Sequence, residues 1–298
     1  MLELDLNRDE TPFGTHIKII GVGGAGGNAI NTMIEYNLTG VEFVSANTNI
    51  MDLKRSQAKT KLQLGKEVTK GLGAGANPEI GRKAAEESRE DIKNHIKDAD
   101  MIFIAAGMGG GTGTGATPII ASLAREMGIL TLGIVNRPFI GEGKKRIVNA
   151  EKGIKKLREN VDTLIVVPNE KLKEIYPDMT VIEAFKKADN VLYEAAKAVS
   201  DIIHYSGYMN VDFADIQTVM ANKGLALMGT GVGDGDNRAI DAANCAMNNP
   251  LLSEIPLENA KGILINITAG KDIKVDEFET ITQEIGKKVA DGGEIITG

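Results

Sequence analysis

The sequence predicts an α/β protein with a doubly wound parallel sheet, a long central helix and a smaller second α/β unit. Three observations support this fold class. Short apolar runs alternate with amphipathic stretches of helical length, glycine clusters stand at several junctions between them, and one long apolar-striped segment interrupts the alternation. Alternating strands and helices of this length indicate parallel strands joined by crossover helices.

Five runs in the first part of the chain are predicted strands, because each is short, apolar and bounded by glycine or polar residues. They are 16–21, 41–46, 101–106, 129–135 and 163–167. The stretches between them that predict helices are 28–36, 78–96, 118–127 and 144–160. Proline is favoured at the first position of a helix, so we expect two of these helices to begin at Pro78 and Pro118.

The segment 179–205 repeats apolar residues at helical spacing and predicts one long helix. Beyond it the alternation resumes. Helices are expected at 213–223, 237–248 and 275–290, and strands at 224–230, 262–268 and 294–297. The predicted organisation is therefore a first domain at 1–178, a connecting helix at 179–207 and a second domain at 208–298.

Composition and charge exclude several classes of function. A chain of 298 residues, 42% of them hydrophobic, can bury a large core, and its net charge of −7 gives no diffuse positive field for nucleic acid or anionic lipid. The single Cys245 cannot form an intramolecular disulfide and fits a reducing compartment. The first residues, MLELDLNRDETPF, are acidic and lack an apolar stretch, so we expect no signal peptide, and no run approaches the length of a membrane span. We expect a soluble cytoplasmic protein with no nucleic-acid partner and no direct membrane contact.

Residues 21–26, GVGGAG, follow an apolar run and match G-x-G-x-x-G, the pattern of dinucleotide-binding proteins. That pattern also needs an acidic residue at the end of the second strand, to hold a ribose hydroxyl. The predicted second strand ends in Asn47-Thr48-Asn49, and Glu42 stands near its start. A nicotinamide-dependent oxidoreductase is therefore only a distant alternative.

Two further glycine clusters, 107–115 (GMGGGTGTG) and 71–75 (GLGAG), also stand near helix starts. Such loops place backbone N–H groups at the positive end of a helix dipole, where phosphates bind. Glycine is needed where the backbone has a positive φ or touches a ligand. No G-x-x-x-x-G-K-[ST] motif is present, which excludes a P-loop NTPase. Three clusters suggest a phosphate chain surrounded from several sides.

The run GGGTGTG at 109–115 resembles the signature of the tubulin/FtsZ GTPase superfamily. Other segments resemble the FtsZ family in the expected order, and the resemblance covers essentially the whole chain from about residue 12. These segments are GVGGAGGNAIN (21–31), ANT (46–48), GLGAGANPEIGRKAAEES (71–88), EGKKR (142–146), VPNEKL (167–172), AFKKADNVL (184–192) and NVDFADIQTVM (210–220).

The resemblance implies a protein that binds and hydrolyses GTP and polymerises head to tail into filaments of the cytokinetic ring at the division site. The first domain then becomes a GTP-binding Rossmann-like domain, and the second a C-terminal activation and polymerisation domain. The resemblance also implies that Mg²⁺ binds through the phosphates and water, with no metal site made by protein side chains. A tubulin-like GTP-binding regulator that does not polymerise is the alternative.

The resemblance assigns nucleotide contacts residue by residue. Phe185 and Asp189 match the base-recognition positions, since an aromatic ring stacks on a purine and a carboxylate accepts from two N–H groups that adenine lacks. Glu142 and Arg146 match a pair that contacts the ribose and phosphates. From the residues alone, Phe185 could instead be core, and Glu142 with Arg146 a surface ion pair. The full expected set is Gly23, Gly24, Ala25, Gly26, Gly27, Asn28, Asn47, Gly73, Ala74, Gly107, Gly110, Gly111, Thr112, Gly113, Glu142, Arg146, Asn169, Phe185 and Asp189.

Asp212 and Asp215 have two interpretations. Locally, they are a helix N-cap and a first-turn acid. The resemblance implies instead that, with Asn210, they enter the nucleotide site of the next subunit and position the attacking water. Such a heterologous contact does not close and generates filaments, so hydrolysis would depend on assembly.

Several positions depart from the family pattern. Asn49 replaces an aspartate that is usual there, and Asn136-Arg137-Pro138 stands where Thr-Lys-Pro is common. The sequence stops at Gly298, whereas the family continues into further strands and a tail peptide. We therefore expect a truncated C-terminal domain and no membrane-anchor partner that binds the tail.

Overall fold

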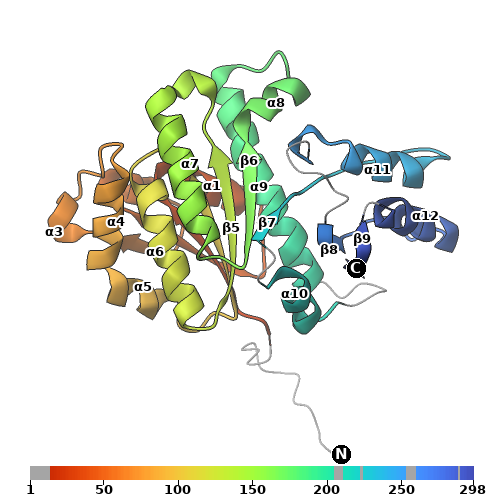
Figure 1. Ribbon diagram of the computed structural model, residues 1–298, viewed down its shortest axis with the longest axis horizontal. Coiled ribbons are helices and arrows are strands. Elements are labelled where there is room, and N and C mark those ends of the chain that lie inside the picture. The colour runs from red at the N-terminus through yellow and green to blue at the C-terminus, as the bar shows by residue number, and fades with distance from the viewer. Residues whose placement is uncertain (1–13, 205–210, 222–223, 253–259, 288) are drawn as a thin grey trace, which may run out of the picture.

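The computed structural model describes residues 14–204, 211–221, 224–252, 260–287 and 289–298. Its centre is a seven-stranded sheet in the order β3-β2-β1-β4-β5-β6-β7, and every neighbouring pair is parallel (Figure 1). This is the predicted doubly wound sheet. The five predicted strands are β1 (Ile17–Val22), β2 (Val41–Asn47), β4 (Met101–Gly107), β5 (Leu130–Arg137) and β6 (Thr163–Pro168).

Two strands of this sheet differ from the prediction. β3 (Thr60–Gln63) was missed, because only Leu62 of its four residues is buried and no apolar run marks it. β7 (Gly224–Ala226) pairs with Thr163–Ile165 of β6. The strand expected to belong to the second α/β unit therefore extends the large sheet instead.

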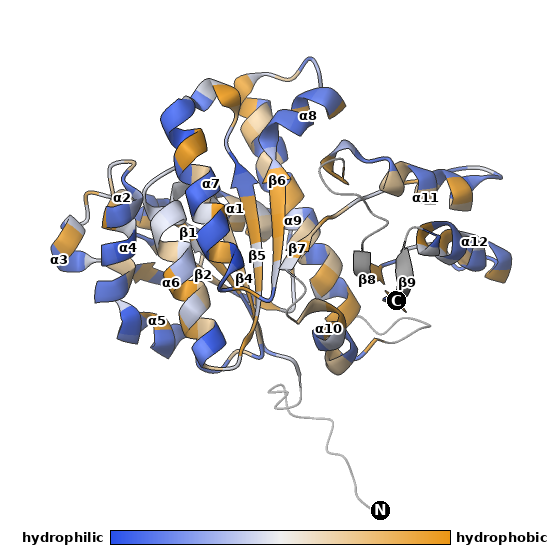
Figure 2. Ribbon diagram, viewed as in Figure 1, coloured by the Kyte–Doolittle hydropathy of each residue, from blue (hydrophilic) through white to orange (hydrophobic). Residues whose placement is uncertain are grey.

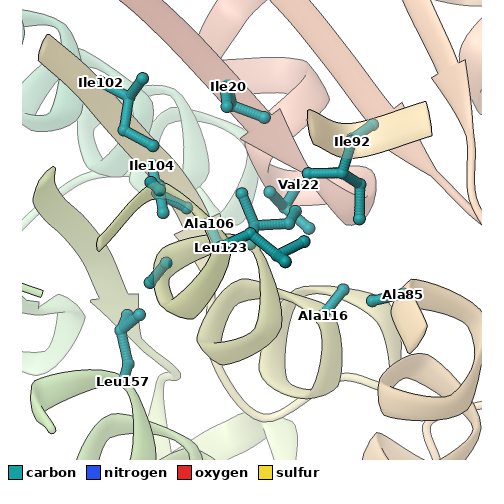
Figure 3. Close-up of a cluster of buried hydrophobic side chains, with 14 of the residues drawn as sticks. Ile20, Val22, Ala85, Ile92, Ile102, Ile104, Ala106, Ala116, Leu123 and Leu157 are labelled. Carbon is teal, nitrogen blue, oxygen red and sulfur yellow. The ribbon is translucent and has the colours of Figure 1, made fainter. Parts of the chain in front are cut away.

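Alternate residues of the strands point to opposite faces, and each face carries its own helices. α1 (Gly23–Glu35) and α9 (Val181–His204) pack on the face of Ile19 and Phe103. The opposite face is covered by α4 (Pro78–Glu87), α5 (Arg89–Ile96), α6 (Thr112–Glu126) and α7 (Lys144–Arg158). In Figure 3, Val22 and Ile104 of the strands gather with Ile92 and Leu123 of the helices.

Two helices begin earlier than the sequence predicts. α1 begins at Gly23 rather than Asn28, and α6 begins at Thr112, six residues before Pro118. Glycine is unfavourable inside helices, so the sequence predicted loops at these glycine clusters. Tertiary packing overrides that preference here. A Cβ added to Gly115 would lie 2.0 Å from the carbonyl oxygen of Pro78, so α6 packs against α4 backbone to backbone.

The predicted helix at 78–96 is broken at Ser88 into α4 and α5. The hydroxyl of Ser88 accepts from the amide of Gly65 at 2.9 Å, which ties the break to the preceding turn. The short helices α2 (Ile50–Arg55), α3 (Lys66–Thr69) and α8 (Asn169–Ile175) were not predicted. Each is only one or two turns long, too short for a periodic apolar stripe.

The remaining elements lie beyond α9 (Figure 1). They are α10 (Phe213–Met220), α11 (Arg238–Met247), the 3₁₀ turn η2 (Pro250–Leu252), β8 (Ala260–Ile265), α12 (Val275–Gly286) and β9 (Val289–Thr297). A second 3₁₀ turn, η1 (Ile140–Glu142), lies earlier in the chain, between β5 and α7. β8 and β9 form a parallel two-stranded sheet. Apolar residues concentrate in the central strands, and polar residues on the outer helices (Figure 2). No helix in the described part of the chain is long and apolar enough to cross a bilayer.

Candidate nucleotide site

The start of α1 meets the start of α6 where the strand order of the sheet reverses. β1 and β4 are neighbours, and their following helices cover opposite faces. A crevice at the carboxyl ends of the strands forms at such a point. A Cβ added to Gly23 would lie 3.0 Å from the amide nitrogen of Gly113, so the two helix starts touch. Two positive helix ends therefore converge on one spot, as a phosphate site requires.

The glycines at this point fall into two groups. Packing requires Gly26, Gly107 and Gly113, because an added Cβ would lie 2.4 to 2.7 Å from a neighbouring atom. Gly110, in contrast, has no atom within 4 Å of an added Cβ, and the nearest atom at Gly24 is 3.9 Å away. The fold itself does not need glycine at Gly110 or Gly24. A ligand held against the backbone does need it.

The third glycine cluster lies against the same helix start. A Cβ on Gly111 would lie 2.7 Å from the Cβ of Ala74, and Ala74 is buried. Gly73 has a φ of +93°, which strongly favours glycine. The structure therefore brings together the three glycine clusters that the sequence predicted to surround one ligand.

The end of β2 joins this group through hydroxyl and amide contacts. The hydroxyl oxygens of Thr48 and Thr112 lie 2.6 Å apart, and both residues are buried. The side-chain amide of Asn47 donates to the Asp52 carboxylate at 3.3 Å. The side chain of Asn49 accepts from the amide of Met51 at 2.9 Å and caps α2. Asparagine and aspartate cap equally well, so the departure at Asn49 leaves this helix start intact.

Glu142 and Arg146 are bonded to one another at the side of the glycine clusters. Nη1 of Arg146 donates to Oε2 of Glu142 at 2.5 Å, and Oε1 of Glu142 accepts from the amide of Phe139 at 3.0 Å. A Cβ on Gly109 would lie 2.7 Å from the carbonyl oxygen of Arg146, so the first turn of α7 borders the second glycine cluster. The Glu142 and Arg146 ion pair therefore stands beside the second glycine cluster.

Two buried asparagines have a side-chain oxygen without a partner. Asn136 is 6% exposed and Asn169 is 4% exposed, and the Oδ1 atom of each accepts no hydrogen bond from the described part of the chain. They stand at the carboxyl ends of β5 and β6, which pair with one another. A buried acceptor left unsatisfied in the protein calls for an explanation, and a ligand that donates to it is one.

Phe185 and Asp189 stand one helical turn apart on α9. Phe185 is 44% exposed, which excludes a purely core role. Its ring meets that of Phe139 edge to face, with centroids 5.5 Å apart. Asp189 is partly buried, and this burial raises its pKa to about 7.

Asp212 and Asp215 are exposed and lie far from these residues. Each accepts from the backbone amide of the other, at 2.9 and 3.3 Å, in a capping box at the start of α10. The hydroxyl of Thr163, the first residue of β6, donates to the carbonyl of Met220 at the end of α10. α10 therefore lies at the amino-terminal edge of the sheet, opposite the glycine clusters (Figure 1). Asn210 lies outside the described residues.

Comparison with known proteins identifies the family. Residues 16–177 match the family described as Tubulin/FtsZ family, GTPase domain, and residues 224–298 match FtsZ family, C-terminal domain. The chain belongs to the FtsZ family. It is a GTPase, as the sequence predicted.

Similar proteins agree with this assignment. The cell division protein FtsZ of Pseudomonas aeruginosa is 56% identical over 266 residues, 89% of this chain and 68% of that protein. Its counterpart in Buchnera aphidicola subsp. Baizongia pistaciae is 50% identical over 283 residues, 95% of this chain and 74% of that protein. The solved FtsZ dimer of M. jannaschii, described as empty, has a TM-score of 0.91 at 43% identity and covers 95% of this chain and 82% of its own.

A more distant structure shows the fold alone. CetZ2 from Haloferax volcanii, solved as a GTPγS-bound protofilament, has a TM-score of 0.80 at 22% identity and covers 95% of this chain and 88% of its own. Membership of the FtsZ family excludes the oxidoreductase alternative.

Two residues of the candidate site, Thr48 and Asn136, were not predicted from the sequence. Thr48 was named only within a motif, although its hydroxyl joins β2 to the start of α6. Asn136 was noted only as a departure from the family. A signal for Asn136 was present, because a polar residue ended the apolar run of a predicted buried strand, as Asn47 does on β2.

Proposed function

We propose that this FtsZ-family GTPase binds GTP at the carboxyl edge of its large sheet and assembles head to tail into filaments of the cytokinetic ring at the division site. The next subunit would complete the GTPase site. One observation supports this most directly: the glycine-lined helix starts and the exposed acid pair Asp212 and Asp215 lie at opposite edges of one sheet. Stacked copies would bring the two together.

The phosphates are proposed to lie on the starts of α1 and α6, within reach of the backbone N–H groups from Gly23 to Asn28 and from Gly110 to Gly113. Asn47, Gly73 and Ala74 border the same spot. The expected Mg²⁺ would bind through the phosphates and water and neutralise charge that develops during phosphoryl transfer. Among the described residues, no group of three or more His, Cys, Asp or Glu side chains is placed to hold a metal alone.

The nucleoside is proposed to lie between α7, α8 and the start of α9. The unpaired oxygens of Asn136 and Asn169 would accept from its hydroxyl or amino groups, beside the Glu142 and Arg146 pair. The half-exposed ring of Phe185 would stack on the base. The carboxylate of Asp189 would accept from two N–H groups of guanine, which favours GTP over ATP.

Hydrolysis is proposed to occur in trans. Asp212 and Asp215 of one subunit, supported by Asn210, would position and polarise the water that attacks the terminal phosphate held by its neighbour. Within one subunit the two carboxylates only cap a helix. A single subunit should therefore hold GTP but hydrolyse it slowly.

The test measures GTP turnover per subunit as protein concentration rises, with filament formation followed by sedimentation in the same samples. Turnover should rise steeply above the concentration at which polymer appears and then level off. A turnover that is independent of concentration, with no sedimented polymer, would favour the regulator that does not polymerise.

A further inference from the structure

The turn at residues 139–142 links the two parts of the proposed nucleoside site. Phe139 is only 7% exposed and lies at the start of this turn, and Glu142 ends it. The Phe139 ring contacts Phe185 on a different element, with centroids 5.5 Å apart and planes at 86°. One short turn therefore supports the ring expected to stack on the base and contains the acid expected near the ribose.

Phe185 needs such support because it projects from the exposed first turns of α9. Its neighbours Val181 and Ile182 are more than 70% exposed, so the start of the helix offers little packing. An unsupported aromatic side chain there would sample several rotamers, and ordering it on binding would cost affinity. The buried Phe139 ring contacts Phe185 edge to face, and 44% of the Phe185 surface stays exposed.

α8 holds the turn from its other side. The Glu170 carboxylate accepts from the amide of Ile140 at 2.5 Å and pairs with Lys173 at 2.8 Å. The ammonium of Lys173 lies 5.6 Å from the centroid of the Phe139 ring, within cation–π range. Burial opposes ionisation of Glu170, yet hydrogen bonds from Lys173 and Ile140 outweigh it and hold the pKa below its usual range. Glu170 thus stays charged at neutral pH.

We propose that Phe139 is a positioning residue that pre-orders Phe185 as the stacking surface for the purine base, and that Glu170 and Lys173 of α8 hold Phe139 in place. The inference rests on the proposed contact between Phe185 and the base. It assigns to Phe139, Glu170 and Lys173 a role in base affinity without any contact with the nucleotide.

The experiment compares two ligands, GTP and ribose 5-triphosphate, which has the same sugar and phosphates without the base. Affinities are measured below the concentration at which the chain assembles. Phe185→Leu should weaken GTP binding on the order of 10-fold, as expected for a lost stacking contact. Phe139→Leu should weaken it about 3- to 10-fold, the range of an aromatic pair. Neither should change the affinity for ribose 5-triphosphate, and the double variant should bind GTP as Phe185→Leu alone does.

A second pair of variants covers the case in which Phe139→Leu fails to fold. Glu170→Ala removes the acceptor that holds the turn, whereas Glu174→Ala removes an equivalent exposed ion pair with Lys171 on the same helix. Glu170→Ala should weaken GTP binding about 2- to 5-fold and leave ribose 5-triphosphate unaffected. Glu174→Ala should change neither affinity. An unchanged GTP affinity in Glu170→Ala would overturn the role of α8.

Four results would overturn the proposal, and the last of them would also overturn the proposed base contact. Equal weakening of both ligands by Phe139→Leu would show a general structural role. If the double variant weakened GTP binding by the product of the two single factors, Phe139 would act independently of Phe185. A GTP affinity lowered by Phe185→Leu but unchanged in Phe139→Leu would remove only the positioning role. If Phe185→Leu itself leaves GTP affinity unchanged, the proposed base contact fails, and this inference fails with it.

Discussion

The two edges of the large sheet are built in different ways. At the carboxyl edge, glycine backbones and buried amides from many elements converge, and two buried acceptors have no partner among the residues that the structure describes. At the amino edge, Asp212 and Asp215 are exposed, and each accepts from the backbone amide of the other at the start of α10. In the proposed function, the carboxyl edge binds the nucleotide, and the amino edge of the next subunit contributes the two acids. Each edge would then complete its chemical role only beside the opposite edge of another copy.

The largest expected effect comes from the amino edge. Asp212→Asn should lower kcat on the order of 10²-fold or more, because the proposed water-positioning carboxylate becomes an amide. Asparagine is as good a helix cap as aspartate, so α10 and GTP affinity should be unchanged. Steady-state turnover and equilibrium GTP binding measure the two effects. Asp276→Asn, at an exposed first-turn acid of α12, is the control. Equal loss of binding and turnover in Asp212→Asn would contradict separate roles for the two edges.

The glycines of the carboxyl edge allow binding and folding to be separated. Gly110→Ala should raise the Kd for GTP on the order of 10-fold, with the free energy of unfolding unchanged to within about 0.5 kcal/mol, because its Cβ would meet no protein atom. Gly115→Ala should destabilise the ligand-free protein by about 1 to 3 kcal/mol, since its Cβ would lie 2.0 Å from the carbonyl oxygen of Pro78. Denaturant unfolding without nucleotide and GTP titration check the pair. A stability loss in Gly110→Ala would remove the case for a ligand there.

GTP binding at the carboxyl edge should depend on pH through Asp189. Because burial raises its pKa from 3.8 to about 7, the carboxyl is protonated below about pH 7 and accepts fewer hydrogen bonds from guanine. GTP affinity should therefore fall as the pH drops below 7, by at most about tenfold per unit, and binding should release a proton. The stability of the ligand-free protein depends on pH in the opposite direction. Because the carboxyl ionises more readily in the unfolded chain than in the folded protein, the free energy of unfolding should fall as pH rises from about 4 to about 7.

Calorimetric titrations of GTP in buffers with different ionisation enthalpies measure the released proton. Asp189→Asn should remove the part of the pH dependence that Asp189 contributes, and the terminal phosphate, which titrates in the same range, contributes equally in both proteins. A proton count of zero at pH 6.5 in the unmodified protein would show that Asp189 does not contact the base.

The sequence predicted most of the carboxyl edge, because local chemistry determines it. Buried parallel strands are apolar runs, and glycines at their ends mark a ligand. The helix starts at Gly23 and Thr112 could not be predicted, since only close packing makes glycine acceptable in these helices: α1 packs through Gly26 against β4, and α6 packs through Gly115 against α4. β7 is three residues long, and its place beside β6 depends on a contact about 60 residues away in sequence. For Asp212 and Asp215, local sequence indicates only a helix cap, and the catalytic role rests on the family resemblance.

The smallest expected effect concerns Asn136 at the carboxyl edge. Its buried, unpaired oxygen should lower the stability of the ligand-free protein and raise its affinity for GTP. Asn136→Leu keeps the branching and the number of side-chain heavy atoms, although its methyl groups are bulkier, and it removes the unsatisfied oxygen, so the ligand-free protein should gain up to about 1 kcal/mol of stability. The same change removes an acceptor for the nucleotide, and GTP affinity should fall several-fold, the equivalent of one hydrogen bond. Thermal unfolding without GTP measures the gain in stability, and the additional stabilisation by GTP measures the loss of affinity. If Asn136→Leu lowered the stability of the ligand-free protein and left GTP affinity intact, the unpaired oxygen would belong to the fold rather than to the site.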